Sequence, residues 1–92
     1  MGEERTRATE AELTIACIQF APRICEKELN IQRSCELLRD AAERGARLCV
    51  LPELASSGYV FNGREEAYEV SEAVPGGEAV EAWRAVARER GI

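Results

Sequence analysis

The sequence contains no histidine, and its four cysteines form no Cys-x-x-Cys pair. Zinc sites are built mainly from these two residue types at such spacings, so we predict no metal site. Cys17, Cys35 and Cys49 lie in apolar runs or on the apolar side of a helix, and we expect them to be small buried residues. Cys25 has basic neighbours that would favour a thiolate, although an ordinary loop thiol is the simpler interpretation.

A positively charged surface is also absent. The formal net charge is -5, and no cluster of basic residues is present, which argues against nucleic acid and anionic membranes as partners. No apolar run approaches the roughly 18 residues of a membrane span. Half of residues 1–12 are charged, and the segment lacks the apolar region of a secretory signal. We expect them to be a disordered tail and the protein to be cytoplasmic.

The spacing of apolar residues predicts an α/β fold. Residues 13–21 and 47–52 are rich in apolar and β-branched residues and are predicted to be strands. Between them, residues 27–44 repeat apolar side chains at three- and four-residue steps, which indicates an amphipathic helix followed by Gly45. A strand, a helix and a strand with short connections form a βαβ unit with parallel strands.

The second half of the chain is predicted to contain two further helices. Residues 64–71 are compatible with a short helix, and residues 78–90 form an amphipathic pattern that ends before Gly91. The sequence Val74-Pro75-Gly76-Gly77 predicts a turn between them. An anion-binding loop is less favoured there, because neither a G-x-G-x-x-G nor a P-loop pattern is present.

Glu53 is the residue most informative about function. It follows the apolar run 48–51 and Pro52, and such a run suits a strand covered on both faces. A carboxylate at that point is costly to desolvate unless it is paired or used, and open α/β sheets bind ligands at the carboxyl ends of their strands. Glu53 is a candidate general base, with a helix cap or a salt bridge as structural alternatives. Tyr59 and Phe61 would either line a pocket beside it or cover the core.

The length of the chain predicts an incomplete fold. Ninety-two residues is below the roughly 100 to 200 residues of a typical domain. Two parallel strands would leave long unpaired edges, which natural domains avoid. Ile92 also looks like the first residue of another strand. We therefore expect residues 13–92 to be the truncated amino-terminal part of a larger domain.

Three segments together carry a family resemblance. They are Ile15-Ala16-Cys17-Ile18-Gln19-Phe20-Ala21-Pro22, Ala42-Glu43-Arg44-Gly45-Ala46, and Leu51-Pro52-Glu53-Leu54 followed by Ser57-Gly58-Tyr59. In combination they resemble the amino-terminal part of the nitrilase superfamily, the carbon-nitrogen hydrolases. The resemblance covers about residues 13–92.

The resemblance implies the βαβ-containing portion of a nitrilase-like α-β-β-α sandwich. It also implies cleavage of a non-peptide carbon-nitrogen bond in a small amide, N-carbamoyl compound or nitrile, by a Glu-Lys-Cys triad without a cofactor. Glu53 matches the catalytic glutamate, and Tyr59 matches a residue near the substrate pocket. Lys27, the only lysine, does not match the family's lysine, and none of the four cysteines occupies its nucleophile motif.

Two interpretations follow from this mismatch. In the first, the chain is a hydrolase fragment that carries only the general base, is inactive alone, and forms homo-oligomers when complete. In the second, it is a non-catalytic interaction module that a partner chain completes through the open edge of its sheet. An unrelated nucleotide-binding fold is disfavoured, because the glycine fingerprint is missing after the first strand.

Overall fold

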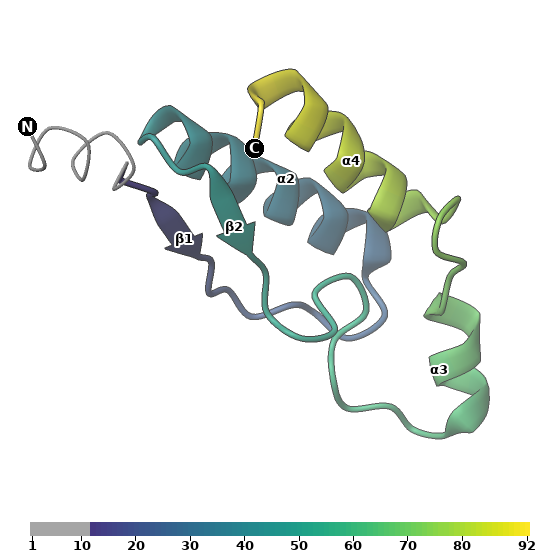
Figure 1. The fold of residues 1–92 in the computed structure, drawn as a ribbon. Coiled ribbons are helices and arrows are strands. Elements are labelled where there is room, and N and C mark those ends of the chain that lie inside the picture. Colours follow the sequence, from purple (N-terminus) through teal and green to yellow (C-terminus); the bar gives the residue numbers. More distant parts are fainter. Residues whose placement is uncertain (1–11) are drawn as a thin grey trace, which may run out of the picture.

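The computed structural model describes residues 12–92, in which two strands and three helices follow in the order strand, helix, strand, helix, helix (Figure 1). Most of the tail predicted at residues 1–12 lies outside the described residues. In chain order the elements are β1 (Ile15–Cys17), α2 (Lys27–Glu43), β2 (Leu48–Val50), α3 (Arg64–Val70) and α4 (Glu78–Arg90). No helix within this range is long and apolar enough to cross a membrane.

The two strands pair in parallel, as the βαβ pattern predicts. Ile15 lies opposite Leu48, and Cys17 lies opposite Val50. The pairing continues slightly beyond the strand ends, because the Ile18 amide donates to the Val50 carbonyl at 2.8 Å. Both strands are nevertheless shorter than predicted. The chain leaves the ladder for the connection to α2 on one side and for the loop that carries Glu53 on the other.

The helix α2 ends close to the predicted position. Gly45 has a φ of +96°, a backbone conformation that L side chains rarely adopt and that commonly terminates helices. Its amide donates to the Ala42 carbonyl at 3.0 Å, and the Ala46 amide donates to the Ala41 carbonyl at 3.0 Å. The last carbonyls of α2 are therefore satisfied as the chain turns into β2.

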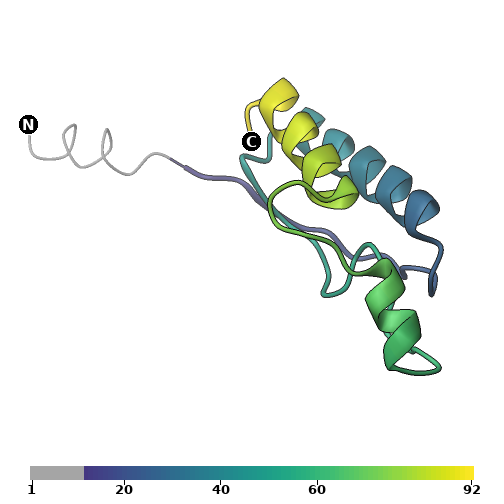
Figure 2. The same cartoon turned by 90° about the vertical axis from the view of Figure 1, so that its right-hand side faces the viewer.

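The core lies between the sheet and two helices. Figure 2 shows α2 and α4 side by side, both on one side of the strands. The buried side chains of this core come from all four elements or their flanks: Ile18, Cys35, Leu38, Ala41, Ala46 and Val86. The Trp83 indole N–H also donates to Ser34 Oγ at 2.7 Å, which satisfies a polar group that lies between α2 and α4. Prediction of both amphipathic helices is thus confirmed.

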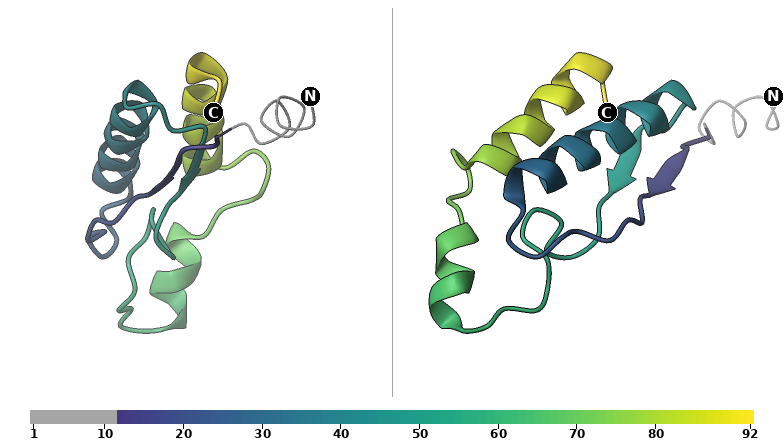
Figure 3. Two further views of the ribbon diagram at one scale, coloured as in Figure 1. Left: turned by 60° about the vertical axis from the view of Figure 1, so that its left-hand side comes forward. Right: turned by 180° about the vertical axis from the view of Figure 1, so that it is seen from behind.

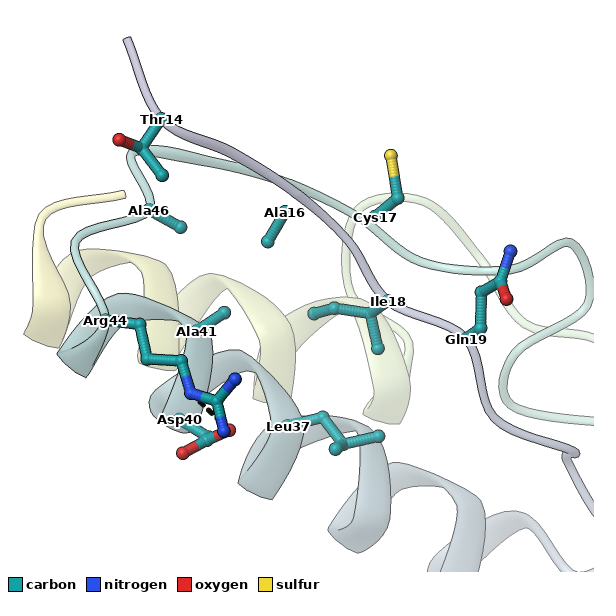
Figure 4. A pocket seen from close by; sticks show the side chains of 10 residues that line it. All are labelled: Thr14, Ala16, Cys17, Ile18, Gln19, Leu37, Asp40, Ala41, Arg44 and Ala46. Atoms are coloured by element: carbon teal, nitrogen blue, oxygen red, sulfur yellow. Dashed lines mark ion pairs between the residues drawn. The ribbon is translucent and has the colours of Figure 1, made fainter.

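The opposite face of the sheet is uncovered within residues 12–92. Ile15, Leu48 and Val50 are each about half exposed, so the predicted coverage of the second strand on both faces is wrong for this part of the chain. Cys17, expected to be buried, is exposed for the same reason. Figure 4 shows Ala16 and Ile18 pointing toward α2 while Cys17 points away, as the alternation of a strand requires. Cys35 is buried and Cys49 is half-buried.

An ion pair joins the amino-terminal ends of α2 and α4. Lys27 Nζ lies 2.6 Å from Glu72 Oε2, and both side chains are largely buried. Glu72 Oε1 also accepts the Val80 amide at 3.0 Å, which satisfies one of the free N–H groups at the start of α4. Desolvation opposes ionisation of Glu72, but Lys27 and the Val80 amide outweigh it and lower the pKa of the carboxyl below its ordinary value.

This pair makes stability depend on pH. Because the pKa of Glu72 is lower in the folded state, its contribution is present above the ordinary value of 4.5 and is lost as pH falls through the folded-state pKa. We expect Glu72→Gln to reduce the loss of unfolding free energy between neutral and acidic pH, measured by urea denaturation. Glu12→Gln, at an exposed position, is the matched control. An identical pH dependence in Glu72→Gln and wild type would contradict this role.

Candidate functional site

Glu53 lies at the carboxyl end of β2. The strand ends at Val50, and Leu51 and Pro52 lead directly into a turn that begins at Glu53. The side chain is exposed, so the burial expected of a residue at the end of a covered strand is not found. The reason is the uncovered outer face of the sheet, which leaves this end of β2 open to solvent.

A tight turn brings Glu53 and Tyr59 together. The Leu54 carbonyl accepts the amides of Ser57 at 3.2 Å and of Gly58 at 2.9 Å. Leu54 and Gly58 both have positive φ, +53° and +85°, and this combination reverses the chain direction within a few residues. As a result the Tyr59 hydroxyl donates to Glu53 Oε2 at 3.0 Å. The two residues that the sequence selects as site residues are therefore in direct contact.

The contact affects the chemistry of the tyrosine. The hydrogen bond to Glu53 raises the pKa of Tyr59 above its ordinary value, and partial desolvation and the carboxylate charge act in the same direction. The phenol therefore remains a donor at neutral pH, and it holds one carboxylate oxygen while the other remains available. Tyr59 is more than half exposed, so it does not cover the core, whereas Phe61 is half-buried.

Asn30 is a buried residue of this region that the sequence analysis missed. Its side chain is almost fully buried in the first turn of α2 and donates to the carbonyl of Ser56, in the loop between Glu53 and Tyr59. The sequence does contain a pattern that indicates the burial of Asn30. Asn30, Ser34, Leu38 and Ala41 follow one another at four- and three-residue steps, which places a polar residue on the buried side of the helix.

The environment of Cys25 differs from the prediction. Desolvation, then the charge and a hydrogen bond of Glu66, and then the charge of Glu69 all raise the pKa of the thiol. The basic neighbours in the sequence do not offset these carboxylates, because Lys27 pairs with Glu72 instead. Cys25 is thus an exposed loop cysteine whose surroundings disfavour the thiolate.

The glycine turn before α4 has a structural role. The turn before α4 is confirmed, and the Gly76 amide donates to Glu81 Oε2 at 3.2 Å, so a side chain of the same chain uses it. Among residues 12–92, no group of three or more potential metal-ligating side chains comes together.

The pocket drawn in Figure 4 is separate from Glu53. It has a volume of about 370 Å³ and lies between β1 and α2, with Ala16, Ile18, Leu37 and Ala41 among its lining residues. Neither Glu53 nor Tyr59 lines it. Its walls are mainly apolar, apart from groups such as Asp40 and Arg44, which pair with each other. No residue of β2 lines it, so within residues 12–92 it is a groove beside β1 on the side away from β2.

Comparison with known sequences decides the family. Residues 14–92 match the sequence profile of the carbon-nitrogen hydrolases. The chain belongs to the carbon-nitrogen hydrolase family. It is 38% identical over 78 residues to a nitrilase of Pyrococcus abyssi, a match that covers 85% of this chain and 30% of that protein. It is 35% identical over 82 residues to an omega-amidase of Xenopus tropicalis, covering 89% of this chain and 28% of that protein.

These matches confirm the predicted resemblance to the nitrilase superfamily. The three helices and the two parallel strands fit part of a carbon-nitrogen hydrolase domain. The chain spans less than a third of the length of the curated relatives it matches.

The contact between Tyr59 and Glu53 can be tested by titration. Tyr68→Phe leaves Tyr59 as the only tyrosine, so its ionisation can be followed by tyrosinate absorbance. In this background we expect Glu53→Gln to lower the pKa of Tyr59 toward its ordinary value, because the carboxylate that accepts the hydrogen bond of the phenol is removed. Glu65→Gln, an exposed change in α3, should leave it unaltered. An unchanged Tyr59 pKa in Glu53→Gln would show that the contact is not formed in solution.

Proposed function

We propose that this chain supplies the general base of a carbon-nitrogen hydrolase that cleaves a non-peptide C–N bond. The observation that carries the proposal is the position of Glu53, directly after β2 and hydrogen-bonded by Tyr59, in a chain of this family. A carboxylate held by one donor retains lone pairs on its second oxygen for a proton. Glu53 is therefore suited to accept a proton from a nucleophile.

The reaction proceeds through a covalent intermediate. Glu53 takes the proton of a cysteine thiol, and the thiolate attacks the carbon of an amide, N-carbamoyl group or nitrile. A lysine stabilises the charge of the tetrahedral intermediate. From an amide or an N-carbamoyl group, ammonia or an amine leaves after receiving a proton, and water then hydrolyses the acyl-enzyme, with the glutamate again acting as the base. A nitrile instead gives a thioimidate, which takes up one water and releases ammonia before the resulting thioester is hydrolysed by a second water.

The cysteine and the lysine of this reaction would come from outside residues 1–92. Lys27 is the only lysine of the chain, and its ammonium group already pairs with Glu72. Cys35 is buried in the core and Cys25 is surrounded by carboxylates. The segment alone would then be inactive, and the complete enzyme would act on a small molecule and form homo-oligomers.

Tyr59 has a second role in the proposal, at the substrate pocket. Its side chain is more than half exposed beside Glu53, so part of it is accessible to a bound substrate. Its hydroxyl remains on the carboxylate, which fixes the distance between the pocket wall and the base. Tyr59 would in this way orient both the substrate and Glu53.

The open sheet supports a second candidate function. Ile15, Leu48 and Val50 expose an apolar face, and within the described residues each strand has only one neighbour. A partner chain could add a strand to such an open edge, as in β-strand addition, and its other parts would then cover the apolar face. In this case the chain would be a non-catalytic module. Such a module would bind its partner equally well after Glu53 is replaced, whereas a hydrolase would lose activity. This difference distinguishes the two candidate functions.

The hydrolase is tested by replacing the base. In the complete protein, Glu53→Gln should lower ammonia release from amides or nitriles by at least about 100-fold, the usual contribution of a general base. Glu65→Gln is the matched control, since it makes the same chemical change at an exposed position in α3. Wild-type turnover in Glu53→Gln would refute the role of Glu53. Absence of turnover in the wild type for all three substrate classes would favour the second candidate.

A further inference from the structure

A single buried amide connects α2 to two neighbouring loops. The side chain of Asn30 is 2% exposed. Its Oδ1 accepts the Arg23 amide at 2.8 Å, and its Nδ2 donates to the Arg23 carbonyl at 2.7 Å and to the Ser56 carbonyl at 3.0 Å. Both N–H groups of the side chain are therefore used. One of them reaches a residue 26 positions away in the sequence.

The contact with Ser56 is part of a continuous seam between the two loops. The Cys25 amide donates to the Ser57 carbonyl at 2.9 Å. Gly58 packs so closely that a Cβ atom there would lie 2.8 Å from Ile24 Cα. The loop after β2 thus rests on the connection between β1 and α2 over three consecutive residues, where the two segments cross in Figures 1 and 3.

This seam lies inside the loop that carries the site. Glu53 and Tyr59 stand on either side of Ser56–Gly58, and both side chains are exposed. Packing therefore contributes little to holding them, and the backbone between them must be held instead. Asn30 does so from α2, whose apolar side is fixed in the core by Cys35, Leu38 and Ala41. A site is held best when its supporting contacts come from a rigid element.

We infer that Asn30 is a positioning residue that holds the Glu53–Tyr59 loop in its working geometry. The inference rests on the proposed function of Glu53 as the general base. Asn30 touches neither Glu53 nor a substrate, and it acts through the backbone of Ser56 and its neighbours.

The test is Asn30→Asp, which keeps the size of the side chain and the acceptor for Arg23 but removes both donors. It also places a carboxylate oxygen against the carbonyls of Arg23 and Ser56. In the complete enzyme we expect kcat to fall by about 10- to 100-fold with KM little changed, because misplacing a catalytic group by about 1 Å can lower the rate to this extent. In the Tyr68→Phe background, the pKa of Tyr59 should also fall, as it does in Glu53→Gln.

Ser34→Ala is the matched control. Ser34 is a fully buried polar residue of the same helix, but its hydroxyl bonds to Trp83 and to the Ile31 carbonyl, away from the loop. It should lower stability while leaving kcat and the Tyr59 titration unchanged. Should Asn30→Asp not fold, Gly58→Ala disturbs the same seam from the loop side, where a φ of +85° and the close approach to Ile24 disfavour any side chain. It should produce the same two effects.

The outcomes separate this inference from the proposed function. If Asn30→Asp and Gly58→Ala lower stability without changing kcat or the Tyr59 titration, Asn30 is only structural and the inference is wrong. If the wild type has no hydrolase activity, the proposed function fails. In that case the Tyr59 titration still decides whether Asn30 holds the loop.

Discussion

The buried side of α2 contacts the sheet, α4 and, through Asn30, the loop that carries Glu53. Leu38 and Ala41 pack in the core with Ile18 of the first strand segment and Val86 of α4. Ser34 accepts a hydrogen bond from Trp83 across the two helices. Parallel strands need a crossover between them, and here α2 is that crossover. The positions of β1, β2 and α4 therefore depend on the burial of this one helix.

Around this helix, polar side chains hold the segments that apolar packing does not reach. The Lys27–Glu72 pair fixes the start of α4 against the start of α2. Asn30 fixes the loop after β2 in a similar way. Lys27 and Asn30 both lie in the first turn of α2. This end of the helix therefore holds both the segment before α4 and the loop after β2. A buried amide with all its N–H groups used is costly to disturb, since losing one partner exposes an unsatisfied group.

The candidate site combines an exposed pair of side chains with a well-held backbone. Glu53 and Tyr59 gain little from burial, but Leu54, Ser57 and Gly58 form a hydrogen-bonded turn between them. Ile15, Leu48 and Val50 form the uncovered face of the sheet, and this face includes β2, the strand that leads to Glu53. Coverage of that face would exclude water from the end of β2 and strengthen the electrostatic interactions of the carboxylate. The proposed base thus has its geometry within this chain, whereas its desolvation depends on what covers the sheet.

Much of the fold is determined by local patterns in the sequence. The apolar spacing of residues 27–44 and 78–90 predicts α2 and α4 to within one residue, and the positions of Gly45 and Gly91 predict their ends. The turn before α4 is likewise predicted from adjacent residues, Val74-Pro75-Gly76-Gly77. These predictions succeed because helix periodicity and glycine conformation depend on near neighbours in the chain.

Tertiary structure alone decided the surroundings of the site. The exposure of Cys17 and Glu53 depends on whether a second layer covers the sheet, which no strand pattern specifies. The contact of Tyr59 with Glu53 depends on the positive φ of Leu54, a conformation that its side chain does not favour and that the seam with residues 23–25 maintains. Ser56, one of the two residues that Asn30 binds, lies 26 residues away in the sequence. Sequence determined which groups are available, and long-range packing determined which of them meet.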